Sequence, residues 1–484
     1  MEKFNNILPD LKKAKIRTKD QTIIKREIFD LPEQVKNLGV GRTYFLRTYG
    51  CQANERDSET IAGILEAMSF TKVDNEEDAD VLFFNTCAIR KNAEDKVFGE
   101  IGMLKKLKRN NPDLIFALSG CMAQEESVVN TLLAKYPQVD LIFGTHNIHR
   151  LPYLLYNAMM SKEKTVEVYS EEGEIVENLP VSRFGKYKAW VNIMYGCDKF
   201  CTYCIVPYTR GKQRSRLMED ILEEIEELKR EGYQEVCLLG QNVNAYGKDL
   251  GMEDGFAKLL EEVAKTNIPR IRFSTSHPRD FSENMVHVMK KYTNIMPSLH
   301  LPVQSGNNDI LKIMGRGYTV EHYKHLYDLL KQEIPNITFS TDIIVGFPNE
   351  THEQFLDTLA LVDYCKYDLA YTFIYSPRES TPAAKMVDNV PEEEKSKRLQ
   401  MLNEKITYYS NLNNQKYLHK TLKVLVDGLS KKNKEVYSGY SEENKLVNFT
   451  GKNVEVGKIV EVYITEIKSY SLNGIVKEET DEQS

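Results

Sequence analysis

The first third of the chain alternates short apolar runs with longer amphipathic stretches. Four apolar runs of strand length are Thr43–Thr48, Val81–Asn85, Leu114–Leu118 and Leu141–Phe143. Helical patterns separate them, for example Asn54–Met68 and Ile89–Arg109. This alternation is typical of a parallel sheet with helices on its faces. We therefore predict an N-terminal parallel α/β domain over residues 42–160, preceded by a polar extension over residues 1–41.

A second series of strands and helices follows a polar stretch, residues 161–183, that reads as a linker. Six further strands are predicted at Ala189–Tyr195, Glu235–Leu239, Ile271–Ser276, Ser298–Val303, Thr341–Phe347 and Leu369–Tyr375. Helical patterns lie between them, and Met218–Glu231 has a strongly charged outer face. Six β/α units predict a partial β/α barrel over residues 183–412, with its site at the carboxyl ends of the strands.

The last part of the chain changes to short strands. After a charged helical pattern from Glu392 to about Lys416, the strands are predicted at Thr421–Val426, Glu435–Tyr440, Lys445–Phe449, Lys458–Ile467 and Ser471–Val476. Five short strands in fewer than 60 residues indicate a small β-barrel of the OB type. We place this β-barrel at residues 415–478, so the overall fold class is α/β with a small terminal barrel.

Composition limits the environment of the protein and its partners. The 484 residues are 41% hydrophobic and 28% charged, as in globular proteins. No apolar run approaches the roughly 18 residues that span a bilayer, and the first residues do not resemble a secretory signal, so we expect a cytoplasmic protein without a membrane partner. The net charge of −7 means that nucleic-acid binding would depend on local basic patches.

Three of the eight cysteines lie in one loop. Cys197, Cys201 and Cys204 have the spacing C-x3-C-x2-C and directly follow the first strand of the second series. Three thiolates bind three irons of a 4Fe-4S cluster and leave the fourth iron without a protein ligand. A structural zinc site normally has four ligands, and no fourth Cys or His is near in sequence. The spacing therefore predicts an iron–sulfur cluster at these cysteines, which we call the loop site.

Three other cysteines each follow an apolar strand. Cys51 follows TYFLRTYG, Cys87 follows DVLFFNT and Cys121 follows LIFALSG. The carboxyl ends of parallel strands share one edge of a sheet, so these side chains should converge. An isolated buried cysteine is common, but three at equivalent positions predict a second three-thiolate site, which we call the strand-end site. Cys237 and Cys365 lie within apolar patterns and are interpreted as core residues.

Two groups of basic residues are candidate nucleic-acid contacts. Arg210, Lys212, Arg214 and Arg216 place four positive charges in seven residues, directly after the loop site. The segment Thr421–Lys477 has nine lysines against seven acidic residues, and its predicted loop carries Lys431, Lys432 and Lys434. Such runs are often solvated surface, and contact with phosphates is the alternative.

The motifs of the chain resemble a known family. The loop C-x3-C-x2-C after the first strand of a β/α barrel resembles the radical S-adenosylmethionine (SAM) superfamily. With the strand-end cysteines, the chain resembles the methylthiotransferase family of radical SAM enzymes over residues 42–478. The motifs that carry this likeness are TYGCQANERDSE (Thr48–Glu59), NTCAIRKNAEDK (Asn85–Lys96), SGCMAQ (Ser119–Gln124), GQNVNAYG (Gly240–Gly247), HLPVQSG (His300–Gly306) and MGRGYT (Met314–Thr319). The terminal barrel resembles a TRAM domain, which is an RNA-binding module.

The resemblance implies an activity and its cofactors. Members of this family attach a methylthio group to C2 of N6-(dimethylallyl)adenosine beside the anticodon of tRNA, using two SAM molecules and two 4Fe-4S clusters. The loop site would then hold the cluster that cleaves SAM to a radical, and the strand-end site the auxiliary cluster that carries or supplies sulfur. An unactivated C–H bond suits such cofactor chemistry. Implied partners are the tRNA anticodon loop, an electron donor such as flavodoxin or ferredoxin, and an unidentified sulfur source; we expect a monomer.

The resemblance also suggests which residues contact SAM. Gly240, Gln241 and Asn242 follow the second barrel strand, where the family binds the amino end of SAM. Gln304 and Ser305 end another strand. Gly346, in IIVGFPNE, belongs to a segment like the one that lies against adenine, where glycine permits close approach. An ordinary loop role is the alternative for each of these residues.

Other functions share much of this pattern. The same chemistry acts on threonylcarbamoyl-adenosine in tRNA or on an aspartate of a ribosomal protein, and the motif wording alone separates these from our first choice. A non-catalytic iron–sulfur RNA-binding protein is an alternative of another class. It would need neither the open iron nor a β/α barrel.

Overall fold

The computed structural model describes residues 6–10, 13–14, 26–88, 91–161, 163–170, 175–430 and 433–477. The chain forms two compact units. The first contains the described residues up to Phe184 together with Met194–Phe200 and Cys204–Arg216. The second contains Gly185–Ile193, Cys201–Tyr203 and the described residues from Leu217 onward. No helix among the described residues is long and apolar enough to cross a membrane.

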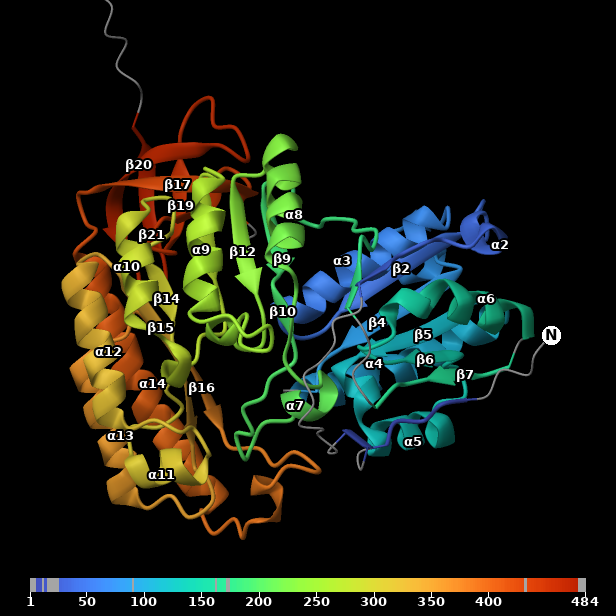
Figure 1. The fold of residues 1–484 in the computed structure, drawn as a ribbon, viewed down its shortest axis with the longest axis horizontal. Helices are drawn as coiled ribbons and strands as arrows, with labels where there is room; N and C mark the ends of the chain where they lie inside the picture. Colours follow the sequence, from blue (N-terminus) through green and yellow to red (C-terminus); the bar gives the residue numbers. More distant parts are fainter. Residues whose placement is uncertain are drawn as a thin grey trace, which may run out of the picture. The chain divides into compact units, whose positions relative to one another are not determined.

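The first unit is built on a six-stranded parallel sheet with the order β3-β2-β4-β5-β6-β7. Its strands are β2 (Thr43–Thr48), β3 (Thr71–Lys72), β4 (Val81–Thr86), β5 (Ile115–Gly120), β6 (Leu141–Phe143) and β7 (Thr165–Glu167). The helices are α2 (Glu33–Lys36), α3 (Gln52–Ala67), α4 (Lys91–Asn110), α5 (Glu126–Lys135), α6 (Leu151–Ser161) and α7 (Val206–Thr209). All residues of β4 and β5 are buried because helices cover both faces of the sheet (Figure 1).

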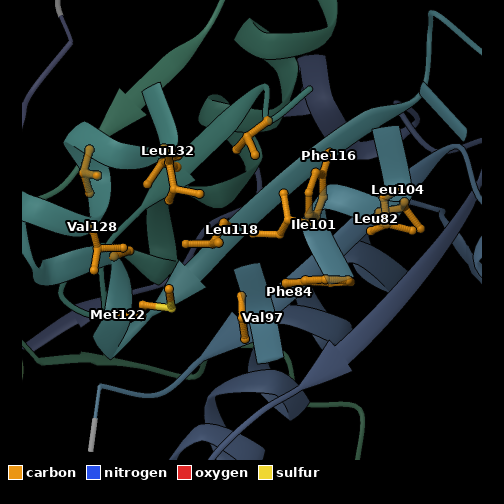
Figure 2. Close-up of a cluster of buried hydrophobic side chains, with 14 of the residues drawn as sticks. Leu82, Phe84, Val97, Ile101, Leu104, Phe116, Leu118, Met122, Val128 and Leu132 are labelled. Atoms are coloured by element: carbon orange, nitrogen blue, oxygen red, sulfur yellow. The ribbon is translucent and has the colours of Figure 1, made fainter. Parts of the chain in front are cut away.

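Alternate residues of the central strands enter two separate cores. Leu82 and Phe84 of β4 face α4 and α5, together with Phe116 and Leu118 of β5 (Figure 2). Phe83, between the first two, packs on the opposite face in the core that contains α3 and α6. This period of two is that of a strand buried on both faces, and it confirms the predicted parallel α/β layer.

The segment predicted as a polar linker contains two strands. β7 forms the sixth strand of the sheet through parallel pairing with β6. β8 (Ile175–Glu177) pairs in parallel with β1 (Arg26–Ile28), within the predicted N-terminal extension. The linker prediction is therefore wrong at these strands. Val166 and Val168 belong to a core cluster. The sequence did not indicate this because the apolar run is short and has polar residues on both sides.

The second unit begins with six parallel strands in two sheets, ordered β13-β12-β9 and β14-β15-β16. The strands are β9 (Lys188–Asn192), β12 (Glu235–Leu239), β13 (Arg270–Phe273), β14 (Ser298–His300), β15 (Thr338–Val345) and β16 (Leu369–Ile374). The Met296 amide donates to the Ile271 carbonyl at 2.8 Å, which joins the two sheets. The six predicted strands are thus present, and they form the wall of a partial barrel.

Helices follow the strands of this partial barrel (Figure 1). They are α8 (Met218–Arg230), α9 (Gly255–Lys265), α10 (Glu283–Lys291), α11 (Asn308–Ile313), α12 (Val320–Glu333), α13 (His352–Cys365) and α14 (Glu392–Gln415). Cys237 of β12 and Cys365 of α13 are 2% and 1% exposed, as expected for core residues. Burial raises the pKa of these thiols to about 11 and about 12 respectively.

The C-terminal strands close into a barrel with the order β17-β18-β19-β21-β20. They are β17 (Thr421–Leu429), β18 (Tyr437–Ser441), β19 (Leu446–Thr450), β20 (Ile459–Ile467) and β21 (Leu472–Val476). Arg270 of β13, only 1% exposed, anchors this barrel by donating to the carbonyls of Tyr440 at 2.8 Å and Lys423 at 2.9 Å. The predicted fold class is confirmed.

Candidate functional site

The strand-end cysteines lie at one edge of the sheet in the first unit. β2, β4 and β5 are adjacent parallel strands, with Thr48 paired to Asn85 and Thr86 paired to Gly120. Cys87 and Cys121 directly follow β4 and β5. Cys51 follows β2 by three residues and is the N-cap of α3. The partial positive charge of a helix N-terminus favours a thiolate at that position.

Contacts between neighbouring loops show that the three cysteines converge. A Cβ added at Gly50 would lie 2.5 Å from the Cβ of Cys87, so the backbone beside Cys51 packs directly on Cys87. The Cys87 thiol forms a hydrogen bond with Cys51. Arg210 donates from Nε to the Sγ of Cys121 at 3.2 Å, and its charge also acts on Cys51. The predicted strand-end site is therefore a compact group of thiols.

Gly120 is required by this geometry. Its φ is +99°, in a region that favours glycine, and an added Cβ would lie 2.2 Å from the Thr86 carbonyl oxygen. The Asn54 amide donates to the same carbonyl at 2.8 Å. The sequence SGC thus brings Cys121 close to the end of the neighbouring strand.

The thiols of the strand-end site differ in their ionisation. The hydrogen bond from Cys87 and the charge of Arg210 outweigh burial and lower the pKa of Cys51 to about 5. Burial raises the pKa of Cys121, against the opposing charge of Arg210. A thiolate is the form that binds metal, so Cys51 is prepared to act as a ligand.

Arg210 connects the strand-end site to its charge partner. Arg210 is 6% exposed, and its guanidinium donates to Asp57 Oδ2 at 2.7 Å and to Asn54 Oδ1 at 3.3 Å. Asp57 and Asn54 both lie on α3, in the motif that contains Cys51. The sequence pattern did not single them out as functional residues, although their place in that motif was the available signal.

The loop site lies between two short paired strands. β10 (Met194–Tyr195) pairs antiparallel with β11 (Arg214–Ser215), which brings the ends of the loop together. The Cys197 amide donates to the Gly211 carbonyl at 3.1 Å. The predicted continuous strand Ala189–Tyr195 is interrupted at Ile193, where β9 ends and β10 follows.

A buried arginine contacts the loop site. Arg316, in the motif MGRGYT, is 5% exposed and donates from Nη1 to the Sγ of Cys201 at 3.3 Å. It also donates to the Pro302 carbonyl at 2.9 Å and to the Tyr318 hydroxyl at 3.2 Å. The motif MGRGYT is recognisable in the sequence, but the role of its arginine becomes visible only in the fold.

The donor sets fit iron–sulfur clusters. All eight cysteines are within the described residues, and none forms a disulfide. In the described part of the chain, no three His, Cys, Asp or Glu side chains are arranged to hold a single metal ion. Each cysteine of a 4Fe-4S cluster binds a different iron, so such ligands converge without sharing one ion. The converging thiols of the strand-end site match this requirement, and the loop site offers three cysteines within one loop.

The predicted SAM residues lie at strand ends of the partial barrel. Asn242, 2% exposed, donates from its amide to Asp280 at 2.7 Å, and its Oδ1 is buried without a hydrogen-bond partner in the described structure. Gly240 is buried and Gln241 is half-buried beside it. Gln304 adopts a φ of +73°, and its carbonyl accepts from the Ile344 amide of β15. The unpartnered oxygen of Asn242 is a position where a polar ligand would bind.

Two of the predicted SAM residues also have close neighbours within the protein. Ser305 is fully buried, and its hydroxyl lies 3.4 Å from that of Thr358 on α13. A Cβ at Gly346, which has a φ of +68°, would lie 2.3 Å from Lys395 Cγ. The close approach that glycine permits there is to the Lys395 side chain.

The basic run after Cys204 is largely buried. Arg216 forms an ion pair with Glu177, and Arg210 is paired with Asp57 as described above. Arg214 is 6% exposed and its guanidinium lies 5.9 Å from the centre of the Tyr195 ring. The structure thus gives Arg210 and Arg216 carboxylate partners in place of the predicted phosphate contacts, while Lys212 is half-buried.

The lysines of the terminal barrel are only partly covered by the structure. Lys434 is exposed in the loop between β17 and β18. Lys431 and Lys432, predicted in the same loop, lie outside the described residues. Lys434 therefore remains a candidate RNA contact.

Family models match three segments of the chain. They are the radical SAM superfamily over residues 191–362, an uncharacterized protein family named UPF0004 over residues 43–144, and the TRAM domain over residues 415–477. The chain is 57% identical over 472 residues to a tRNA-2-methylthio-N(6)-dimethylallyladenosine synthase of Bacillus cytotoxicus, covering 97% of this chain and 92% of the relative. The chain belongs to this synthase family. A synthase of Staphylococcus haemolyticus is 56% identical over 481 residues, covering 99% and 93% of the two chains.

Solved structures support the fold. The chain is similar to the radical SAM methyltransferase TsrM of Kitasatospora setae with cobalamin and a [4Fe-4S] cluster bound, with a TM-score of 0.52 and 14% identity over 71% of this chain and 77% of that one. TsrM with tryptophan and a SAM analogue bound gives a TM-score of 0.51 at 13% identity, over 71% and 75% of the two chains. At these identities the likeness concerns the fold alone. The predicted membership of the radical SAM methylthiotransferases is confirmed by the synthase relatives and the radical SAM match.

Proposed function

We propose that this chain replaces the C2 hydrogen of N6-(dimethylallyl)adenosine, beside the anticodon of tRNA, with a methylthio group. The observation that carries the proposal is the convergence of Cys51, Cys87 and Cys121 as a site separate in sequence from the loop site. One three-cysteine site, the loop site, is sufficient for cleavage of SAM. A second three-cysteine site provides a place for sulfur chemistry. The high identity to named synthases over nearly the whole chain supports the same substrate.

Each three-cysteine site would hold one 4Fe-4S cluster with an open iron. When bound, these groups together supply the electron that cleaves one SAM and the sulfur that a second SAM methylates. Asn242 and the strand end at Gln304 are the residues that we propose to hold SAM, because the Asn242 oxygen is buried without a partner. Gly240, Gln241, Ser305 and Gly346, at strand ends of the same partial barrel, complete the SAM contacts that we propose.

The residues around the two sites exclude water and hold the sulfurs. Cys121 packs in a cluster with Ala88, Ile205 and Tyr208. In the second unit, Tyr203 of the cysteine loop packs against Phe347, with ring centres 6.4 Å apart. Such burial protects reactive intermediates from solvent, which radical chemistry requires.

We propose that the terminal barrel contacts the tRNA through exposed lysines, among them Lys434. Its net charge of +2 within a chain of −7 favours a polyanion at this module. A splayed base in a single-stranded loop is the form in which an enzyme reaches C2 of adenine. We also propose that a flavodoxin or ferredoxin supplies the electron. The enzyme is proposed to act as a monomer.

Nucleoside mass spectrometry of tRNA from a strain without this gene tests the function. We expect 2-methylthio-N6-dimethylallyladenosine to disappear and N6-dimethylallyladenosine to accumulate, with restoration by the wild-type gene. Unchanged levels of the methylthio nucleoside would exclude the proposed substrate. Loss of a methylthiolated threonylcarbamoyl-adenosine would instead assign the chain to the alternative tRNA substrate.

A further inference from the structure

One buried arginine donates a hydrogen bond to one cysteine sulfur at each site. The Nε of Arg210 lies 3.2 Å from the Sγ of Cys121, and Nη1 of Arg316 lies 3.3 Å from the Sγ of Cys201. The two arginines are 6% and 5% exposed. Arginine has no accessible neutral form, so each site contains a permanent positive charge of low solvent exposure.

The charge partners of the two arginines differ. Asp57 Oδ2 accepts from Arg210 at 2.7 Å, and both side chains are buried. Because the two charges are opposite, this ion pair has no net charge. The other partners of Arg316 are neutral: the Pro302 carbonyl and the Tyr318 hydroxyl. No Asp or Glu oxygen in the described part of the chain lies within 4.0 Å of an Arg316 nitrogen. Arg316 therefore faces the sulfur of Cys201 with a charge that no carboxylate within 4.0 Å compensates.

A buried cation without a carboxylate is costly unless an anion of another kind compensates it. A cluster with three thiolates is such an anion, and it becomes more negative when it accepts an electron. Hydrogen bonds to sulfur and a nearby positive charge both stabilise the reduced cluster and so raise its reduction potential. The pair Arg210–Asp57 supplies a hydrogen bond to sulfur but little net charge. Arg316 supplies both a hydrogen bond to sulfur and a net positive charge.

We propose that Arg316 is a positioning residue that raises the reduction potential of the loop-site cluster, and that Asp57 cancels most of the same effect of Arg210 at the strand-end cluster. This inference rests on the proposed function, because it assumes that both sites hold clusters. Its consequence is that the electron needed to cleave SAM is accepted more readily at the loop site than its cysteine ligands alone would allow. The strand-end cluster is correspondingly less inclined to take that electron.

The alternative is that each arginine only fills space and satisfies local hydrogen bonds. Loss of such a residue lowers stability and cluster content without changing the potential of the clusters that remain. The measurement must therefore report potential for one cluster at a time. Alanine at Cys51, Cys87 and Cys121 leaves the loop site alone, and alanine at Cys197, Cys201 and Cys204 leaves the strand-end site alone.

In the first background we compare R316K, R316Q and R316M with the parent by electron paramagnetic resonance during stepwise reduction with dithionite and mediators. R316Q and R316M should lower the ratio of reduced to oxidised cluster at least tenfold at a fixed potential, a shift of about 59 mV for one electron. R316K keeps the charge and should stay closer to the parent than either. R398K, at a buried arginine paired with Glu350, is the matched control and should leave the potential unchanged.

In the second background, D57N removes the compensating charge without creating a cavity and should raise the potential of the strand-end cluster. The proposal is overturned if D57N leaves that potential unchanged. It is also overturned if R316K shifts the loop-site potential as far as R316Q or R316M does, or if those variants match the parent. Iron analysis of the parents separates this from the proposed function: absence of iron in either background contradicts the two-cluster proposal itself.

Discussion

The ion pair between Arg216 and Glu177 tests whether the basic run after Cys204 stabilises the fold or contacts RNA phosphates. Nε of Arg216 lies 2.8 Å from Oε1 of Glu177, and Nη2 lies 2.8 Å from Oε2. Both side chains are 8% exposed, so the pair is bidentate and largely withdrawn from water. Removing one partner of such a pair leaves an uncompensated buried charge and costs about 3–5 kcal/mol. We expect this cost in R216M and in E177Q, and a smaller one in the double variant R216M/E177L.

Hydrogen exchange measured by mass spectrometry over β8 and β11 reports the local opening free energy. If the ion pair between Arg216 and Glu177 stabilises this region, exchange should be faster at both strands in each single variant. The double variant should exchange more slowly than either single variant. Binding of an anticodon stem-loop RNA, measured by fluorescence anisotropy across salt concentrations, should keep its salt slope in R216M. A slope smaller by about 0.7–0.9, the value for one lost phosphate contact, with unchanged exchange would refute the reasoning.

Three further predictions concern single features. Gly120→Ala should abolish assembly of the strand-end cluster, seen as loss of about half of the iron, because its methyl group would collide with the neighbouring strand; full iron content would contradict this close packing. In metal-free reduced protein, Cys51 should react with iodoacetamide down to about pH 5, because the hydrogen bond from Cys87 stabilises the thiolate, whereas a midpoint near 8.5 would show an ordinary thiol. Arg270→Met should accelerate hydrogen exchange in Thr421–Leu429, since two carbonyls of the terminal barrel lose their donor; unchanged exchange would mean that other contacts hold this barrel.

Local pattern was sufficient to predict most of the elements and the cysteine positions. Strand period and turn residues placed Cys51, Cys87 and Cys121 at strand ends, and parallel pairing then brought those ends to one edge. Short strands in polar surroundings were missed because β7 and β8 are three residues long and take their stability from pairing with β6 and β1.

The partners of charged residues were beyond the reach of the sequence. Arg210 and Asp57 are 153 positions apart, and Arg316 is 115 positions from Cys201. A basic run looks the same in sequence whether its charges meet phosphates or buried carboxylates. Only the fold shows that Arg210 faces a cysteine and that Arg216 faces Glu177.

The central claim is that the chain contains two separate cluster sites with different tasks. The most direct measurement is iron content and SAM cleavage under dithionite in two variants, one with alanine at the three strand-end cysteines and one with alanine at the three loop-site cysteines. We predict about eight irons per chain in the wild type and about four in each variant. The strand-end variant should still cleave SAM but transfer no methylthio group, and the loop-site variant should not cleave SAM. Equal loss of cleavage in both variants would contradict this division of tasks.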